Sequence, residues 1–294
     1  MQVSGTDIAF IGTGVMGASM AGHLLKAGAK VTVYNRTKSK ADALVAAGAK
    51  WADSPAKAVA GAAIVFTMVG FPTDVEAVYL GPEGIIAASK PGTLFVDFTT
   101  SDAALAARIS TAATAAGRAA IDAPVTGGDT GARNATLSIM VGGDEASFAA
   151  VKPFFDVMGK TAILQGGPGA GQYTKMANQI SVAGSLLGTV ESMLFAEKAG
   201  LDPMRVLDNI GGGSAQSAQL VNLAPRMLTG DFEPGFYSMH FLKDLRIALD
   251  SAKTMGLRLP LLTLAESLFV RMQEKGFGAK GTQALYRLYR DGNH

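Results

Sequence analysis

The segment DIAFIGTGVMGASMAGHLLKAGAKVTVY, residues 7–34, predicts a strand, a glycine-rich turn, a helix and a second strand in direct succession. The first strand is Asp7–Ile11, the helix is Val15–Ala27, and the second strand is Lys30–Tyr34. Between the first strand and the helix lies GTGVMG, a G-x-G-x-x-G pattern. The pattern alone is weak, because glycine-rich chains produce it by chance. Its place after an apolar strand and at the start of a helix is typical of dinucleotide-binding βαβ units.

Each glycine of this turn has its own expected task. Gly12 permits a tight turn, Gly14 lets the backbone approach a pyrophosphate, and Gly17 allows the helix to pack closely on the strand. Backbone amides and the positive end of the helix would hold the anion. The alternative is a purely structural turn. The residues predicted to bind the cofactor here are Gly12, Thr13, Gly14, Val15, Met16 and Gly17.

The same alternation of strands and helices continues beyond the turn. Apolar runs predict strands at Ala62–Met68, Thr93–Asp97 and Ala119–Asp122, and helical patterns fall at Ser39–Ala47 and Ser101–Ala116. Continuous apolar strands are expected in a sheet that is covered on both faces. Repeated β-α units of this kind predict a parallel, doubly wound sheet with right-handed crossovers.

A change of pattern predicts the domain boundary. Leu137–Val141 and Thr161–Leu164 could add further strands, with a helix at Glu145–Met158 between them. After the glycine-rich break at residues 166–169 the chain is helical, starting with one long helix at Tyr173–Ala199. We therefore expect an α/β protein with a Rossmann-type domain at residues 1–165 and an all-helical domain at residues 166–294.

Composition excludes several classes of function. The 294 residues carry a net charge of +2 without a basic block, so we expect no nucleic-acid partner. The absence of cysteine excludes disulfides and thiolate chemistry, and His23, His240 and His294 lack metal-ligand spacing, so no metal site is expected. No apolar run approaches a membrane span and no leader pattern begins the chain, so a cytoplasmic location is expected.

The end of the second strand predicts the choice of cofactor. An NAD-preferring site usually has an acidic residue about 20 residues after the glycine turn, bound to the ribose 2′-hydroxyl. This chain has Asn35-Arg36-Thr37 there, and the Arg36 guanidinium could pair with a 2′-phosphate. We expect NADP, with NAD still possible. In the alternative, Arg36 and Lys38 are ordinary surface cations.

Four stretches together carry a family resemblance. They are GTGVMGASMAGHLLKAG (residues 12–28), DAPVTGG (Asp122–Gly128), GAGQYTKMANQ (Gly169–Gln179) and HFLKDL (His240–Leu245). With them the chain resembles the β-hydroxyacid dehydrogenases, the group of 3-hydroxyisobutyrate dehydrogenases, tartronate semialdehyde reductases and glyoxylate/succinic semialdehyde reductases. Their order and spacing cover essentially the whole chain. The resemblance implies that the second domain is similar to that of 6-phosphogluconate dehydrogenase, binds a small carboxylate substrate, and assembles into a homodimer or homotetramer.

Lys175 is the expected acid/base. Reduction of an aldehyde needs a proton as well as a hydride, and a lysine in a partly desolvated cleft can have its pKa lowered towards the working range. By its position near a helix start, Lys175 would more often be a solvated surface charge; the resemblance implies catalysis instead. Asn178, three residues on, shares its helix face and could orient the substrate or the lysine. Gln179 stands where some relatives have a second asparagine, and it is given less weight.

Thr126-Gly127-Gly128 matches the family's Ser-Gly-Gly substrate loop, with threonine in the serine position. The hydroxyl and the exposed amides can hold a substrate carboxylate. The alternative is a glycine turn after a strand. Asp122 is expected only to cap that strand end.

Further cofactor contacts follow from the resemblance. Val69, Gly70 and Asp74 follow the strand at residues 62–68, where a doubly wound sheet binds nucleotide at its carboxyl edge. Gly70 replaces a proline that is frequent in the family. Thr100 would lie near the nicotinamide, and Lys243 would close over the cofactor unless it is a surface lysine paired with Asp244. Residues 211–216 and Phe236 are expected to shape the far side of the substrate pocket.

These assignments imply an NADP-dependent oxidoreductase for a small β-hydroxy acid or its semialdehyde, of the 3-hydroxyisobutyrate or 2-hydroxy-3-oxopropionate type. A glyoxylate/succinic semialdehyde reductase is the first alternative. Imine reductases usually replace the catalytic lysine, and 6-phosphogluconate dehydrogenases have a much longer helical domain. A non-catalytic NADP-binding module is the alternative from another class of protein, and the retention of Thr126, Lys175 and Asn178 argues against it.

Overall fold

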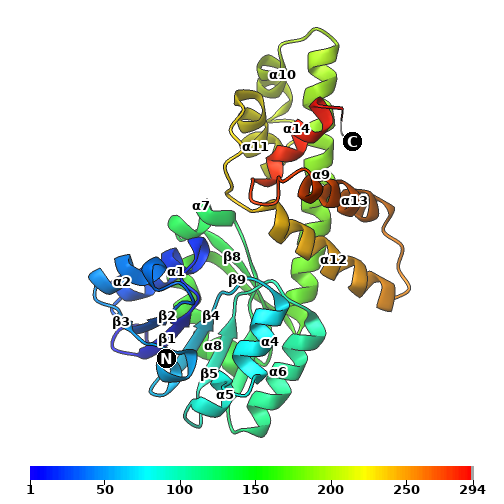
Figure 1. Cartoon of the computed structure of the whole chain (residues 1–294). Coiled ribbons are helices and arrows are strands. Elements are labelled where there is room, and N and C mark those ends of the chain that lie inside the picture. Colours follow the sequence, from blue (N-terminus) through cyan, green and yellow to red (C-terminus); the bar gives the residue numbers. More distant parts are fainter. Residues whose placement is uncertain (293–294) are drawn as a thin grey trace. The chain divides into compact units, whose positions relative to one another are not determined.

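The computed structural model describes residues 1–292, so His294 lies outside the described residues. It divides into two compact units, a Rossmann unit from Met1 to Lys175 and a helical unit from Met176 onward (Figure 1). The long helix α9 (Ala170–Lys198) begins in the first unit and continues into the second.

The Rossmann unit is built on a nine-stranded sheet within residues 1–292. Six parallel strands stand in the order β3-β2-β1-β4-β5-β6, and β8 then pairs antiparallel with β6 and with β7. β9 pairs parallel with β8. The strands are β1 (Asp7–Ile11), β2 (Lys30–Tyr34), β3 (Lys50–Trp51), β4 (Ile64–Thr67), β5 (Leu94–Asp97), β6 (Ala119–Asp122), β7 (Val125–Thr126), β8 (Leu137–Gly142) and β9 (Gly159–Gly166). The predicted parallel sheet is therefore correct for its first six strands, while the far edge is mixed.

Alternating side chains of the strands reach two separate cores. In β1, Ile8 and Phe10 join one buried cluster, whereas Ala9 and Ile11 join the cluster on the opposite face. A strand places successive side chains on opposite faces, so a run that is apolar at every position fits only a sheet covered on both sides. The helices that follow the strands supply this cover (Figure 1).

The four helices predicted for the Rossmann unit begin near their predicted positions, and its four other α-helices were not predicted. Asp102 caps α6, its carboxylate accepting from the Ala104 N–H at 2.6 Å, and therefore moves the start two residues past the predicted Ser101. The predicted helix at Ser39–Ala47 starts as a 3₁₀ turn. The elements are α1 (Val15–Lys26), η1 (Lys38–Ala41), α2 (Asp42–Ala46), α3 (Pro55–Val59), α4 (Pro72–Leu80), α5 (Ile85–Ala88), α6 (Ala103–Ala115), α7 (Gly128–Arg133) and α8 (Glu145–Met158).

The helical unit packs around α9. The apolar side chains of Leu186 and Val190 on α9 share one core with Phe241 and Phe269, whose ring centroids lie 4.9 Å apart. By length and composition α9 could cross a membrane, but the core helix of a soluble protein passes the same test, and the buried residues Leu186 and Val190 pack as in such a core. The other elements are α10 (Pro203–Ile210), α11 (Ala218–Thr229), α12 (Ser238–Thr254), α13 (Pro260–Glu274), η2 (Thr282–Ala284) and α14 (Leu285–Arg290).

Candidate active site

The glycine turn between β1 and α1 has almost no room for side chains at two of its three glycines. A Cβ atom on Gly12, where φ is +97°, would lie 2.2 Å from the Met68 carbonyl oxygen. A Cβ atom on Gly17 would lie 2.0 Å from the Gly12 carbonyl oxygen. A Cβ on Gly14 would meet no described atom within 4 Å. The first and third glycines are therefore required by packing, and the second borders open space.

The open side of this turn suits an anion. No described side chain caps the first turn of α1 at Gly14, and that turn holds no acidic residue. The Thr13 hydroxyl is buried and has no hydrogen-bond partner among residues 1–292. The Asn35 Oδ1 accepts from the Thr13 N–H at 3.0 Å and ties the turn to the end of β2. Free amides at a helix start, with an orphaned hydroxyl beside them, fit the pyrophosphate of a dinucleotide.

Arg36 and Asp74, which the sequence could only assign separately, lie beside each other. Arg36 follows β2 with 88% of its side chain exposed, and its Nη1 lies 3.6 Å from the Asp74 Oδ1. The other Asp74 oxygen accepts from the Phe71 N–H at 3.1 Å at the start of α4. The guanidinium thus stands where β2 ends, in solvent and beside a carboxylate.

A buried network joins the carboxyl ends of β4 and β5. The Asp97 Oδ1 accepts from the Thr67 hydroxyl at 2.7 Å and from the Thr99 N–H at 3.0 Å. The Thr99 hydroxyl in turn accepts from the Val69 N–H at 3.0 Å. This network fixes the two loops that carry the predicted cofactor contacts Val69, Gly70 and Thr100.

Asp97 makes the stability of the Rossmann unit depend on pH. Burial raises the pKa of its carboxyl to about 6, against the opposing effect of the Thr67 and Thr99 hydrogen bonds. The folded chain keeps this proton at pH values where the unfolded chain has lost it, so stability falls as pH rises from about 4 to 6. The difference amounts to roughly 2–3 kcal/mol. We expect Asp97→Asn to gain stability relative to the wild type over this interval, as measured by urea unfolding at several pH values. Parallel pH profiles for the two proteins would contradict this expectation.

Lys175 lies in the first turns of α9, directly beneath the predicted substrate loop. Its side chain is only 7% exposed, so it is not a solvated surface charge. The Nζ donates to the Val125 carbonyl oxygen at 2.9 Å. Val125 belongs to the two-residue strand β7, which leads into Thr126 and then into Gly127 and Gly128, both at positive φ. The fold of the Rossmann unit thus brings the amine to the base of the Thr126-Gly127-Gly128 loop.

Asp122 has a different role from the expected one. Its buried carboxylate accepts from the Gly169 N–H at 2.7 Å and from the Gln172 N–H at 2.8 Å. It therefore caps the start of α9, a role that the sequence did not predict. Burial raises the pKa of Asp122 to about 6, while the N–H groups of Gly169 and Gln172 act in the opposite direction. The sequence showed the residue but not this role, because its partners lie 47 and 50 residues away.

A second group of predicted residues meets within the helical unit. The Asn178 Nδ2 donates to the Gln179 Oε1 at 2.8 Å, and the Gln179 Nε2 donates to the Asp244 Oδ2 at 2.6 Å. The Lys243 Nζ lies 3.1 Å from the Asp244 Oδ1, with a side-chain exposure of 11%. Lys243 is thus paired with Asp244, as in the alternative to a cofactor contact, but it is largely buried and not a surface lysine. Gln179, which received less weight than Asn178, is the buried link between Asn178 and Asp244.

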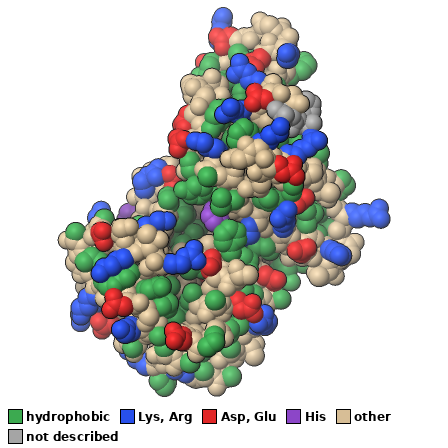
Figure 2. Space-filling model, viewed as in Figure 1, with side chains coloured by type: hydrophobic (Ala, Val, Ile, Leu, Met, Phe, Trp, Pro, Cys, Tyr) green, Lys and Arg blue, Asp and Glu red, His purple; other side chains and the backbone are tan. Residues whose placement is uncertain are grey.

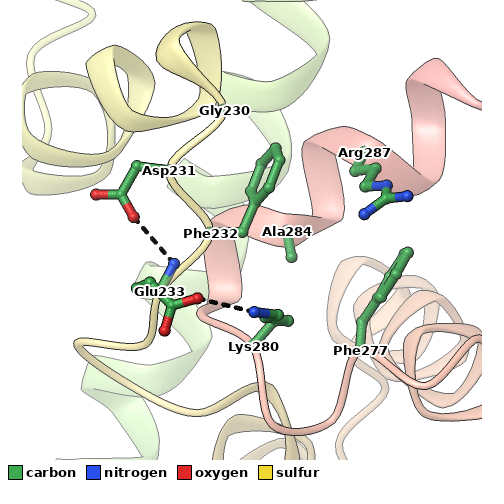
Figure 3. A pocket seen from close by; sticks show the side chains of 8 residues that line it. All are labelled: Gly230, Asp231, Phe232, Glu233, Phe277, Lys280, Ala284 and Arg287. Atoms are coloured by element: carbon green, nitrogen blue, oxygen red, sulfur yellow. Dashed lines mark hydrogen bonds and ion pairs between the residues drawn. The ribbon is translucent and has the colours of Figure 1, made fainter.

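The other features of the helical unit lie apart from these residues. Phe236 packs edge-on against the Phe241 ring at 5.8 Å, as part of the core. A pocket of about 170 Å³, shown in Figure 3, contains none of the predicted site residues. Its Lys280 Nζ and Glu233 Oε1 pair at 2.8 Å. The lining residues are Gly230, Asp231, Phe232, Glu233, Phe277, Lys280, Ala284 and Arg287.

The surface charges are mixed. On the face shown in Figure 2, lysine and arginine side chains alternate with aspartate and glutamate rather than forming one basic field. Among residues 1–292, no group of three or more His, Asp or Glu side chains is placed to hold a metal ion.

Comparison with known proteins accounts for both units. Residues 7–167 match the family model of the NAD-binding domain of 6-phosphogluconate dehydrogenase. Residues 169–289 match the model of the NAD-binding domain of NADP-dependent 3-hydroxyisobutyrate dehydrogenase. The fold and the glycine turn therefore define an NAD(P)-dependent oxidoreductase with a Rossmann unit and a helical unit of the 6-phosphogluconate dehydrogenase kind.

Individual relatives narrow this class. An uncharacterized oxidoreductase of Bacillus subtilis, YkwC, is 49% identical over 96% of this chain and 98% of its own. The 2-hydroxy-3-oxopropionate reductase of Escherichia coli is 41% identical over 89% of each chain. A structure of Mycobacterium tuberculosis 3-hydroxyisobutyrate dehydrogenase with L-serine superposes with a TM-score of 0.87, at 32% identity, over 99% of this chain and 100% of that one. The chain belongs to the 3-hydroxyisobutyrate dehydrogenase-like family of β-hydroxyacid dehydrogenases, which confirms the resemblance and the expected fold class.

Proposed function

We propose that this β-hydroxyacid dehydrogenase reduces a short semialdehyde with NADPH, or oxidises the corresponding β-hydroxy acid with NADP, and that Lys175 is its acid/base. The observation that carries the proposal is the buried Lys175 amine, held 2.9 Å from the Val125 carbonyl oxygen at the base of the Thr126-Gly127-Gly128 loop. A buried ammonium next to a loop that can bind a carboxylate is suited to protonate a carbonyl oxygen of the same small molecule.

The chemistry needs one proton donor from the protein. When bound, the nicotinamide cofactor supplies the hydride that adds to the aldehyde carbon. Lys175 gives a proton from its ammonium to the carbonyl oxygen, which becomes the hydroxyl of the product, and it takes that proton back in the direction of oxidation. Asn178, one turn later on α9, is proposed to orient the substrate. The Thr126 hydroxyl and the amides of Gly127 and Gly128 are proposed to bind the substrate carboxylate.

The relatives support a substrate of three or four carbons. One relative is a 2-hydroxy-3-oxopropionate reductase, and the superposed dehydrogenase structure holds L-serine. 2-Hydroxy-3-oxopropionate, 3-hydroxyisobutyrate and serine all have a carboxylate and an oxygen on the third carbon. We therefore propose a substrate of the 3-hydroxyisobutyrate or 2-hydroxy-3-oxopropionate type. The alternative, a glyoxylate or succinic semialdehyde reductase, differs in the distance between the carboxylate and the reacting carbonyl.

A substrate panel tests the proposed function. Purified protein is mixed with NADPH and, in turn, 2-hydroxy-3-oxopropionate, methylmalonate semialdehyde, succinic semialdehyde and glyoxylate, and the loss of NADPH absorbance is followed. The highest kcat/KM is expected with one of the first two. A preference for succinic semialdehyde or glyoxylate would support the alternative. No turnover of any of them, or of the matching alcohols with NADP, would favour the non-catalytic NADP-binding module.

Arg36 is proposed to select NADP. Its guanidinium stands in solvent after β2, where it can pair with the 2′-phosphate, and Asn35 and Thr37 beside it add no negative charge. We expect Arg36→Ala to raise the KM for NADPH about tenfold, the loss of one charge-assisted contact, and to leave the KM for NADH nearly unchanged. Steady-state kinetics with both cofactors measure this.

Lys38→Ala is the matched control for Arg36→Ala, because Lys38 is a neighbouring cation whose amine lies over the Trp51 ring, 5.4 Å from its centroid. It should change neither KM by more than about twofold, the size of a screened surface charge. Equal effects of the two substitutions would indicate a general positive field instead of a phosphate contact. Comparable kcat/KM values for NADPH and NADH in the wild type would contradict the preference itself.

Assembly into a homodimer or homotetramer and a cytoplasmic location stay predictions. Exposed apolar side chains of the helical unit support assembly, among them Phe195 on α9 and Leu261 and Leu264 on α13. Large exposed apolar side chains are candidates for a subunit interface.

A further inference from the structure

Gln172 has an unusual position for a residue with no expected role. It lies in the first turn of α9, with a side chain that is 0% exposed. Its Nε2 donates to the Thr99 carbonyl oxygen at 2.8 Å, and its Oε1 accepts from the Ser101 N–H at 2.9 Å. The carboxamide therefore binds the backbone on both sides of Thr100.

The backbone of Gln172 is held as firmly as its side chain. Its N–H donates to the Asp122 Oδ2 at 2.8 Å. One residue thus joins three segments of the Rossmann unit: the end of β6 through Asp122, the first turn of α9, and the loop between β5 and α6 that contains Thr100.

Lys175 follows Gln172 by three residues on the same helix, so less than one helical turn separates them. The Lys175 amine donates to the carbonyl oxygen of Val125, the first residue of β7, at 2.9 Å. Since the helix is rigid over one turn, the Gln172 carboxamide sets where the Thr100 loop lies relative to the Lys175 amine.

We propose that Gln172 is a positioning residue for hydride transfer. It holds the loop with Thr100, the proposed nicotinamide contact, in a fixed position relative to α9, the helix that carries the proton donor Lys175. The proposal rests on the proposed function. Proton and hydride must reach the same carbonyl in one geometry, and a misplacement of about 1 Å can cost about 10²-fold in rate. The expected signature is a lower kcat with little change in cofactor affinity.

Two substitutions separate positioning from packing. Gln172→Met fills a similar volume but cannot bind the Thr99 and Ser101 backbone groups, and it should lower kcat about 10- to 100-fold at every pH. Gln172→Glu keeps the shape. Its introduced carboxyl can donate to the Thr99 carbonyl only when protonated, whereas the ionised form would place a negative charge against that oxygen.

The kcat of Gln172→Glu should therefore depend on pH. Relative to the wild type at the same pH, it should be nearly intact at low pH and fall as pH rises through the pKa of the introduced carboxyl. Burial raises that pKa, and so do three neighbouring carboxylates: Asp122, which accepts from the Gln172 N–H, Asp97, which accepts from the Thr99 N–H, and Asp102, which follows Ser101 in sequence. Lys175 on the same helix acts in the opposite direction. The ratio of the variant kcat to the wild-type kcat at each pH cancels the titration of these neighbouring groups, because both proteins contain them.

The experiment measures kcat for NADPH-dependent semialdehyde reduction between about pH 5 and 8, the isotope effect with the C4-deuterated cofactor, and the NADPH dissociation constant by fluorescence. For Gln172→Met we expect a larger isotope effect and a dissociation constant within about twofold of the wild type, because misplacement slows hydride transfer itself. Gln165→Glu is the matched control, since Gln165 is exposed on β9 in the same unit, and it should keep the wild-type kcat at every pH.

Three results would overturn the inference. The first is a kcat of Gln172→Met within about twofold of the wild type, and the second is a kcat of Gln172→Glu that is lowered by the same factor at all pH values. The third is a decrease in kcat that parallels the decrease in the thermal unfolding midpoint of each variant. Should Gln172→Met not fold, Gln172→Glu at low pH still decides. Lys175→Ala, run in parallel, separates this inference from the proposed function. If Lys175→Ala stays active, or the wild type has no turnover, the proposed function fails and the inference with it. If Lys175→Ala is inactive while Gln172→Met is unimpaired, only the inference fails.

Discussion

Replacing Lys175 with alanine should lower kcat for semialdehyde reduction by about 10²–10⁴-fold, the range lost with one well-placed acid/base group. The NADPH dissociation constant should stay the same, because the amine binds the Val125 carbonyl at the substrate loop, whereas the proposed pyrophosphate site is the glycine turn. Pre-steady-state kinetics and fluorescence titration with NADPH measure the two quantities separately. Lys57→Ala is a suitable control, since Lys57 is an exposed lysine of the same unit.

Lys175→Arg distinguishes a proton donor from a positive charge. A guanidinium keeps the charge but does not release its proton in the working pH range, so this variant should remain as inactive as the alanine variant. If Lys175→Arg regained most of the wild-type kcat, Lys175 would act by electrostatic attraction alone. Turnover that survives Lys175→Ala would remove the acid/base assignment altogether.

Gly17→Ala should lower the stability of the fold, whereas Gly14→Ala should lower the affinity for NADPH. At Gly17 the new Cβ would lie 2.0 Å from the Gly12 carbonyl oxygen and 3.0 Å from the Phe10 ring, so α1 must move away from β1. We expect a loss of about 1–3 kcal/mol or more in the free energy of unfolding, which exceeds the gain of about 1 kcal/mol from better helix propensity. At Gly14 the Cβ meets no described atom within 4 Å, so stability should be kept while NADPH affinity falls about tenfold or more.

Urea unfolding of the free protein and NADPH titration of both variants provide this test. The pattern would be contradicted if Gly14→Ala bound NADPH like the wild type, because the space beside Gly14 would then not be where the pyrophosphate lies. It would also be contradicted if Gly17→Ala were as stable as the wild type.

Long elements with a clear period were predictable from the sequence. The helix Glu145–Met158 and the strands Asp7–Ile11 and Lys30–Tyr34 have the predicted bounds, because helical spacing marks the helix, a continuous apolar run the first strand and an alternating pattern the second. The two-residue strands β3 and β7 were not predicted, since two residues carry no period. The antiparallel pairing of β8 with β6 was not predictable either, because an apolar run does not reveal the direction of its neighbour.

The residues expected at the site could be named from motifs, but their connections could not. The motifs assigned Arg36 and Asp74 to different segments, but in the structure the two side chains form an ion pair. The motifs also gave no connection between Lys243 and Asn178, which the structure links through Gln179 and Asp244. Gln172 stood inside a quoted motif without a role, and Asp122 was expected only to cap its strand end. Their roles are hydrogen bonds to backbone groups 47 to 73 residues away, which no local pattern encodes.

The attachment of α9 has a consequence for protein engineering. Its first turn, with Lys175 just behind it, is anchored inside the Rossmann unit by Asp122 and Gln172, while the remaining turns form the core of the other unit. A chimera could join residues 1–175 of this chain to the helical portion of a homologue. It would keep Lys175 together with the hydrogen bonds of Asp122 and Gln172 that hold the start of α9. The contribution of the helical portion to substrate preference, including that of Asn178, could then be exchanged while Lys175 and the Thr126-Gly127-Gly128 loop stay unchanged.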